Sequence, residues 1–378
     1  MTANNVVAKN RIDMNRTKII LVGGFLGSGK TTLIWKVAER LIADGKHVGL
    51  VTNDQAPELV DSELLRRQHL SVSEVAGSCF CCNFNGFTDA VKAVRQEAKA
   101  DIVMAEPVGS CADLSATILQ PLKKYWNTEL SVSPLTVLAD PSRLKSILHA
   151  GKGGLHEDAA YIFSKQLEEA DIIVITKTDT ISPEDLEQLK SDTETAFPKS
   201  SVMAVCALSG EGIDEWLAEV TTKTEAGTRL LDIDYDRYAH GEAVLGWLNG
   251  TLDLTAPQPE VWDVFLKILM NQLQVSFERE SLPVGHVKVI AENGKLYSIG
   301  NITGADRQLT LREGAGTSTN LRLIINARVE CSPEHLDQLV REALIQSING
   351  RYSDKVNAWR YLQPGRPNPT HRFDSVVS

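Results

Sequence analysis

The sequence has no long apolar run, no excess of basic charge and no histidine-rich tract. Residues 1–16 are polar with scattered charges and lack the apolar core of a signal peptide, and no later run is long enough to span a membrane. The net charge of −10 and the pI near 5.4 argue against nucleic acid as the main partner. We therefore expect a cytoplasmic protein that engages neither nucleic acid nor membrane, with a flexible N-terminus over residues 1–16.

Cysteine is also scarce, yet three of the six cysteines, Cys79, Cys81 and Cys82, fall within four residues. In a reducing compartment thiols stay free rather than forming structural disulfides. Three thiols on one loop suit a soft or borderline metal such as Zn²⁺, Co²⁺ or Ni²⁺. Buried thiols acting as small hydrophobes and a redox pair are the alternatives. The sequence does not choose among the candidate fourth ligands, which are Cys111, Glu74, His69 and His156. The other histidines, including His240, look isolated.

The clearest motif is GFLGSGKT, from Gly24 to Thr31, which matches G-x-x-x-x-G-K-[ST]. It follows an apolar run over 19–22 and precedes apolar residues at helical spacing, so it has the strand–loop–helix context that a phosphate loop requires. Glycines let backbone amides surround phosphate oxygens, and the new helix adds the positive end of its dipole. We expect Lys30 to reach the outer phosphates and the Thr31 hydroxyl to ligate Mg²⁺. The predicted phosphate-binding residues are Gly24, Gly27, Ser28, Gly29, Lys30, Thr31 and Thr32.

Short apolar runs alternate with amphipathic helical patterns from residue 17 to 224. This alternation predicts an α/β P-loop NTPase domain with a mostly parallel, helix-covered sheet, in which ligands lie beyond the carboxyl ends of the strands. Residues 225–240 are expected to form a linker. Residues 241–355 predict a smaller α+β, ferredoxin-like domain, with a strand over 242–252, a helix over 259–273 and a hairpin turn at 292–294. The tail over 356–378, rich in Pro, Arg and Asn, is expected to be loosely held.

Two carboxylates at strand ends and a nearby glycine carry the expected phosphate chemistry. Asp54 follows the run over 48–52, and Glu106 ends the run over 102–105. We expect Asp54 to approach Mg²⁺ or the attacking water and Glu106 to hold a water of the Mg²⁺ shell, so that Thr31, Asp54 and Glu106 form the magnesium site. The amide of Gly109 is expected to sense the γ-phosphate. Lys30, Asp54 and Glu106 are the predicted catalytic residues, and no catalytic base is identified.

The base-binding prediction comes from the run that ends in Thr176-Lys177-Thr178-Asp179. A carboxylate at Asp179 can accept hydrogen bonds from the ring N–H and the amino group of guanine, whereas adenine offers no such donor pair on that edge. The Lys177 stem can lie over the base plane. Amides of the next strand-end loop, which begins Cys206-Ala207-Leu208, can reach the guanine carbonyl oxygen.

These segments, in the order GGFLGSGKTTL, VTNDQ, GSCFCC, AEPVG, TKTD and CALSGEG, resemble the CobW/HypB/UreG family of SIMIBI-class P-loop GTPases, its CobW branch in particular. The resemblance covers most of residues 17–350. It implies Mg²⁺ and GTP binding, slow hydrolysis of GTP to GDP and phosphate, and a transition metal, Zn²⁺ or Co²⁺, at Cys79, Cys81 and Cys82. It further implies delivery of metal or metal cofactor to a client metalloenzyme. Thr176 stands where the family usually has Asn, and the His-rich segment of many zinc-handling members is missing.

Other functions remain open on the sequence alone. One is a G-protein chaperone that gates a cobalamin-dependent enzyme without itself carrying metal. A thiol redox switch on a GTPase scaffold is another, and Asp179 argues against a third, a small-molecule kinase. Related P-loop GTPases often dimerise around nucleotide, so a nucleotide-dependent homodimer is a further expectation.

Overall fold

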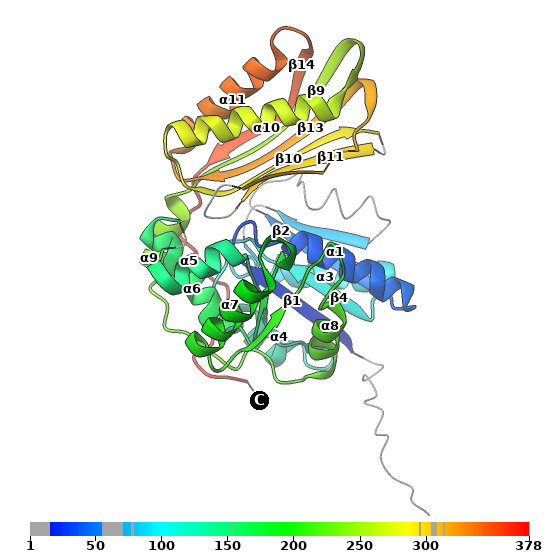
Figure 1. Cartoon of the computed structure of the whole chain (residues 1–378). Coiled ribbons are helices and arrows are strands. Elements are labelled where there is room, and N and C mark those ends of the chain that lie inside the picture. Colours follow the sequence, from blue (N-terminus) through cyan, green and yellow to red (C-terminus); the bar gives the residue numbers. More distant parts are fainter. Residues whose placement is uncertain are drawn as a thin grey trace, which may run out of the picture.

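The computed structural model describes residues 16–54, 71–76, 79–152, 154–294, 296–303, 308–312 and 314–377. Within these ranges the chain forms two domains, each built on its own sheet (Figure 1). Apart from Arg16, the N-terminus that we expect to be flexible lies outside the described residues. No helix in the described ranges is long and apolar enough to cross a membrane.

The first domain is built on a sheet of parallel strands in the order β3-β2-β4-β1-β6-β7-β8, with β5 also paired to β1. The strands are β1 (Thr17–Gly24), β2 (Val48–Asp54), β3 (Ser71–Ala76), β4 (Ile102–Glu106), β5 (Leu130–Val132), β6 (Thr136–Ala139), β7 (Ile172–Ile175) and β8 (Ser201–Ala204). All eight residues of β1 are buried, as expected for a parallel strand covered on both faces.

Helices cover both faces of this sheet. They are α1 (Lys30–Ala43), α3 (Phe84–Ala98), α4 (Gln120–Tyr125), α5 (Pro141–Ala150), α6 (Glu157–Glu169), α7 (Pro183–Ala196) and α8 (Ile213–Thr222), with a π-helical turn at Ser115–Leu119 and a 3₁₀ turn at Thr178–Thr180. Side chains alternate across β1, so Ile19 and Leu21 pack in the core with α3 and α6, whereas Ile20 and Val22 pack with α1 and α8. The predicted P-loop NTPase architecture is confirmed.

The second domain is an antiparallel sheet in the order β12-β11-β10-β13-β9-β14, with two helices packed on one face. Its elements are β9 (Gly246–Val261), α10 (Trp262–Arg279), β10 (Val284–Asn293), β11 (Leu296–Thr303), β12 (Gln308–Arg312), β13 (Thr317–Val329), α11 (Pro333–Ile348) and β14 (Ser353–Leu362). Without the added strands β11 and β12, the order β10-β13-β9-β14 is that of a βαββαβ ferredoxin-like sandwich. The predicted α+β class is therefore confirmed.

Some element boundaries differ from the sequence-based expectation. Glu242, expected to begin a strand, lies in helix α9 (Tyr235–Ala243), which starts because the Asp234 side chain caps two backbone amides. The helix expected from residue 259 begins at Trp262, because β9 continues to Val261 alongside β13. Strand β14 extends the second sheet to Leu362, past the expected boundary at 355.

The helix-free face of the second sheet is turned toward the phosphate loop (Figure 1). Lys177 Nζ donates to Thr303 Oγ1 at 3.2 Å, and a guanidinium nitrogen of Arg143 lies 3.3 Å from the carbonyl oxygen of Val284. A cavity of about 530 Å³ lies between the two domains. The second sheet lines it with His286, Lys288, Asn301, Thr303, Arg312, Asn326 and Arg328, among others. The phosphate loop therefore opens into the cavity between the two domains rather than onto bare surface.

Candidate nucleotide and metal site

The phosphate loop has the backbone geometry that its glycines allow. Gly24, Gly27 and Gly29 have φ values of 134°, 78° and 91°, which side-chain-bearing residues rarely adopt. A Cβ at Gly24 would lie 2.5 Å from the carbonyl oxygen of Leu138. The buried Lys30 Nζ donates to the carbonyl oxygen of Gly24 at 2.8 Å, so the ammonium lies against the loop that is predicted to hold phosphate.

Thr31 and Glu106 meet at the predicted magnesium position. The Thr31 hydroxyl donates to Glu106 Oε1 at 3.0 Å, and both side chains are buried. A hydroxyl and a carboxylate are the hard oxygen donors that Mg²⁺ prefers, so the pair fits that ion. The side chain of Asp54, at the end of β2, lies outside the described residues, and its role stays a prediction.

Gly109 lies against the phosphate loop. A Cβ on Gly109 would come within 2.8 Å of Leu26 Cδ2 and 3.1 Å of the Leu26 backbone nitrogen. Gln166 Nε2, on α6, donates to the carbonyl oxygens of both Gly109 and Cys111, at 3.0 and 2.8 Å. Gln166 was not among the predicted functional residues; the available signal was a lone amide on the apolar face of a helix. Gln166 thus holds the loop segment that joins the phosphate loop to Cys111.

The predicted base-binding residues line the same cavity. Asp179 is exposed in the turn after β7 and accepts a hydrogen bond from the Cys206 thiol at 3.4 Å. Ala207 and Leu208 also line the cavity. The Thr176 hydroxyl donates to the Ser28 carbonyl oxygen at 2.8 Å. It therefore ties the base-binding strand to the phosphate loop.

Lys177 is held by a buried carboxylate. Its Nζ lies 2.8 Å from Asp140 Oδ2, at the N-terminus of α5. Burial alone would raise the pKa of Asp140, but the Lys177 ammonium and hydrogen bonds from Ser142 and Arg143 hold that pKa below its usual value. This pairing fixes the Lys177 stem along the cavity wall, where it is predicted to cover the base.

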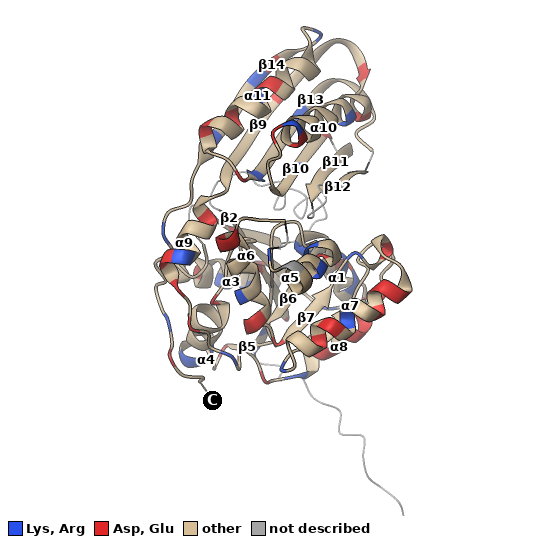
Figure 2. Cartoon of the chain, turned by 60° about the vertical axis from the view of Figure 1, so that its left-hand side comes forward, with Lys and Arg blue, Asp and Glu red and all other residues tan. Residues whose placement is uncertain are grey.

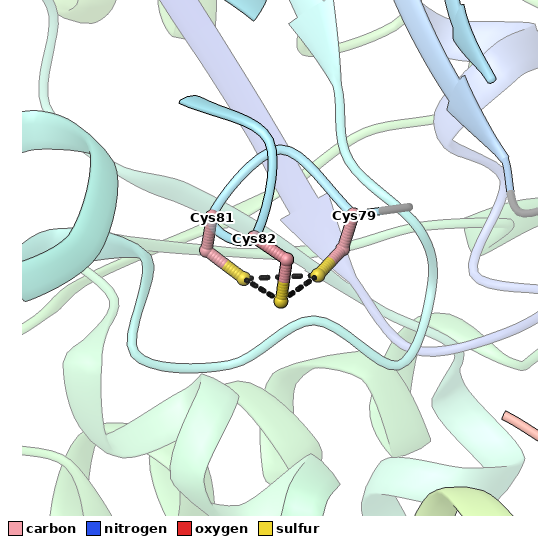
Figure 3. Close-up of side chains that lie close together, drawn as sticks. All are labelled: Cys79, Cys81 and Cys82. Carbon is pink, nitrogen blue, oxygen red and sulfur yellow. Dashed lines mark hydrogen bonds between the residues drawn. The ribbon is translucent and has the colours of Figure 1, made fainter. Parts of the chain in front are cut away.

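The three clustered thiols converge on one point (Figure 3). The Cys79 sulfur lies 3.0 Å from those of Cys81 and Cys82, which are 3.8 Å apart. Adjacent Cys81 and Cys82 would diverge on an extended loop, but a tight turn brings them together, since the amides of Cys82 and Asn83 donate to the Cys79 carbonyl oxygen. Asn53, at the end of β2, accepts the amide hydrogen of Phe80 and so anchors this turn to the sheet.

The buried Cys111 thiol lies beside the three clustered thiols and is hydrogen-bonded to Cys79 and Cys81, although it is outside the tight group that these two form with Cys82. Hydrogen bonds from the thiols of Cys111, Cys81 and Cys82 lower the pKa of Cys79, whereas the hydrogen bond to Cys79 raises the pKa of Cys82 to about 11. The thiols of Cys79, Cys81 and Cys111 are therefore hydrogen-bonded to one another. Four cysteines are a donor set used by zinc sites, so these residues fit the predicted metal.

The other candidate fourth ligands lie elsewhere. His156 belongs to a separate group with Asp158 and His240. Glu74 is on β3 and is not part of the thiol group, and His69 lies outside the described residues. Among the candidates, the structure brings Cys111 to the cluster.

Residues 18–204 match the family model described as CobW/HypB/UreG, nucleotide-binding domain. This domain belongs to the CobW/HypB/UreG family. The chain is 24% identical over 227 residues to zinc chaperone CobW of Sinorhizobium sp, a match that covers 53% of this chain and 62% of that protein. It is 29% identical over 178 residues to zinc chaperone YeiR of Escherichia coli K12, covering 46% of this chain and 50% of that protein. The match thus spans half to three fifths of these CobW/HypB/UreG relatives.

Solved structures show weak likeness to the chain. HypB from Archaeoglobus fulgidus covers 54% of this chain and 88% of its own, with 18% identity and a TM-score of 0.38. Zn(II)-bound YjiA GTPase from E. coli covers 88% of this chain and 99% of its own, with 14% identity and a TM-score of 0.36. Because these scores are low, the fold is assigned from the strand order of this chain itself.

The tail expected to be loosely held instead lies along the thiol cluster. We call residues 363–377 the C-terminal strap; the chain end reaches α4, at the end of the first domain remote from the second sheet (Figure 2). The amide of Asn368 donates to Cys82 Sγ at 3.2 Å, and that of Thr370 donates to the Cys81 carbonyl oxygen at 2.8 Å. The Thr370 hydroxyl donates to the Cys82 carbonyl oxygen at 3.1 Å. The strap therefore covers one side of the cluster.

A salt bridge fastens the strap to the loop that carries Cys111. Arg372 Nε lies 2.7 Å from Oδ2 of the buried Asp113, which has a φ of 63°. The His371 ring packs between Phe84 and Tyr125, with ring centroids 5.1 and 5.5 Å apart. The strap is held by backbone hydrogen bonds, ring contacts and the ion pairs Arg366–Asp236 and Arg372–Asp113, which no apolar periodicity in the sequence signals.

A chain that ends at Leu362 is expected to expose Cys82. Truncation removes three hydrogen bonds between the strap and the cysteine turn, each worth ~0.5–1.5 kcal/mol. Since ~1.4 kcal/mol corresponds to a factor of ten, Cys82 should be alkylated at least about tenfold faster than in the full chain. The rate at each cysteine is read by mass spectrometry after timed reaction with iodoacetamide, and Cys331 in the second domain serves as the internal control. An unchanged rate at Cys82 would show that the strap does not protect the cluster.

Proposed function

We propose that this protein is a Mg²⁺-dependent GTPase whose hydrolytic cycle controls a transition-metal ion held by Cys79, Cys81, Cys82 and Cys111. The observation that carries the proposal is the short segment after β4. It begins at Glu106, beside Thr31, packs Gly109 on the phosphate loop, and ends at Cys111 beside the thiol cluster. Loss of the γ-phosphate would therefore shift the position of Cys111, one of the four proposed sulfur ligands.

The residues around the phosphate loop have distinct parts in hydrolysis. Lys30 exchanges its contact with the Gly24 carbonyl oxygen for phosphate oxygens, while Thr31 and Glu106 hold Mg²⁺. Bound Mg²⁺ neutralises the charge that develops on the phosphates during transfer to water. The amide of Gly109 donates to the γ-phosphate and loses that partner when phosphate leaves. Catalysis then rests on positioning and charge neutralisation, with no base assigned, and the rate is expected to be slow.

After hydrolysis the segment around Gly109 relaxes and loosens the sulfur ligands, which releases the metal to a client metalloenzyme. The zinc chaperones among the matched relatives favour Zn²⁺ as the cargo, and the four thiols also suit Co²⁺. A cytoplasmic location and a nucleotide-dependent homodimer belong to the same proposal.

Exchanging Asp179 for asparagine tests the guanine assignment. The variant loses two charge-assisted hydrogen bonds, worth ~1.5–3 kcal/mol each, so GTP affinity is expected to fall at least about tenfold. Xanthosine triphosphate carries a carbonyl where guanine has its amino group, and it should bind the Asp179→Asn protein more tightly than the unaltered one. Competition against a fluorescent GTP analogue measures both affinities.

Asp192→Asn, which changes a half-buried carboxylate on α7 that pairs with His149, is the matched control and should leave both affinities unchanged. If the unaltered protein binds ATP as tightly as GTP, or if Asp179→Asn binds GTP normally, the guanine assignment is wrong.

A further inference from the structure

A second group of metal-ligating side chains lies outside the thiol cluster, where α6 meets α9. His156 and Asp158 are at the N-terminus of α6, and His240 is in the last turn of α9. Asp158 Oδ2 lies 2.5 Å from His240 Nδ1 and 3.8 Å from His156 Nδ1. The ligand atoms of all three residues lie within 4.8 Å of one another. His240, which looks isolated in the sequence, is thus brought beside His156 across 84 residues.

Contacts around the group hold its members in place before any ion binds. Arg237 Nε binds Asp158 Oδ1 at 2.7 Å, which leaves Oδ2 facing the two imidazoles. Glu330 Oε2, at the end of β13, accepts the amide hydrogen of His156 at 3.0 Å. Gly241 permits the close approach of the helices, since a Cβ there would lie 2.3 Å from the Asp158 carbonyl oxygen. Preorganised ligands of this kind reduce the cost of binding an ion.

An ion pair between Asp158, Arg237 and His240 would by itself account for part of this group. It does not require a second imidazole at the same place. The ring of His156 lies 5.3 Å from that of His240, between centroids, and its nearest nitrogen is within 4.8 Å of the other two ligand atoms. A cation there would replace the hydrogen bond from the Asp158 amide to His156 Nδ1, at 3.2 Å, and the contact between His240 Nδ1 and Asp158 Oδ2. Two imidazole nitrogens and a carboxylate oxygen form a donor set typical of Zn²⁺.

We propose that His156, Asp158 and His240 form a second transition-metal site. The site has three protein ligands and leaves a fourth position for water or for a ligand carried in with the ion, as in zinc sites that exchange ligands. The His240 side chain is 59% exposed, so the ion has direct access from solvent. The site contains no thiolate and is separate from the buried sulfur cluster. It therefore suits a more loosely held, exchangeable ion.

Equilibrium dialysis of the full chain against Zn²⁺, with metal counted per protein, tests the proposal. The unaltered protein is expected to bind two ions, and His240→Ala is expected to bind one, with the weaker site lost or its affinity lowered at least about tenfold. Because the His240 side chain is largely exposed, the variant should fold normally. His149→Ala is the matched control, since His149 is an exposed histidine that faces the single carboxylate of Asp192 at 3.8 Å.

Cobalt separates the two sites, because Co²⁺ bound to thiolate gives an intense near-ultraviolet charge-transfer band and Co²⁺ on His156, Asp158 and His240 does not. The His240→Ala protein should keep that band and lose the ion that does not contribute to it. Equal stoichiometry and affinity in His240→Ala and His149→Ala would overturn the second site. Absence of the band in the unaltered protein would instead contradict the thiol site. Failure of the second site and failure of the thiol site can therefore be told apart.

Discussion

Lys30→Ala is expected to reduce phosphate release from GTP at least about 100-fold, the loss typical when one preorganised group that stabilises transition-state charge is removed. The Lys30 ammonium is buried and lies on the phosphate loop, 2.8 Å from the Gly24 carbonyl oxygen. Lys30 is therefore the cation of the phosphate loop that is placed to meet the outer phosphates. Steady-state phosphate release at saturating GTP and Mg²⁺ gives the rate.

Lys36→Ala is the matched control for this prediction. Lys36 lies on the same helix but pairs with Glu39 at 3.4 Å on the outer surface, so its loss should leave the rate within about twofold, as expected for a weak surface ion pair. Thermal unfolding of both variants excludes a folding defect as the cause. A Lys30→Ala protein that hydrolyses GTP within tenfold of the unaltered rate would show that this loop is not the phosphate site.

The second large effect is expected at Cys111. Replacing it with alanine should weaken Zn²⁺ binding at the thiol cluster at least about 100-fold, because loss of even an outer-shell partner costs 10–100-fold and Cys111 is proposed as a direct ligand. Chelator competition measures the affinity. Cys331→Ala, a half-buried thiol of the second domain, should leave it unchanged. Equal affinities in the two variants would leave Cys111 outside the metal site.

The residues predicted to bind nucleotide lie together in the structure because local backbone fixes their positions. Glycines at set spacing define the phosphate loop, and strand ends deliver Glu106 and Asp179 to one edge of a parallel sheet. The three thiols were predicted to act together, but they converge because of a tight turn at Cys79, which the sequence does not reveal. Features formed by residues close together in the chain could thus be predicted from the sequence.

Features made by distant segments could not be predicted in this way. Gln166 reaches Gly109 only because α6 packs beside that loop. His156 and His240 meet only because α6 and α9 cross at Gly241. The strap has no apolar periodicity, and two of its three hydrogen bonds to Cys81 and Cys82 come from backbone amides, which every sequence carries.

The central claim is that the state of the nucleotide sets the affinity of the thiol cluster for metal. Its most direct test is the Zn²⁺ affinity of the unaltered protein, measured by chelator competition with a non-hydrolysable GTP analogue and then with GDP, Mg²⁺ being present in both. Coupling free energies between sites are typically ~1–3 kcal/mol, so the account predicts binding about 5–150-fold tighter with the GTP analogue. Equal affinities in the two states would contradict it, whatever the hydrolysis rate.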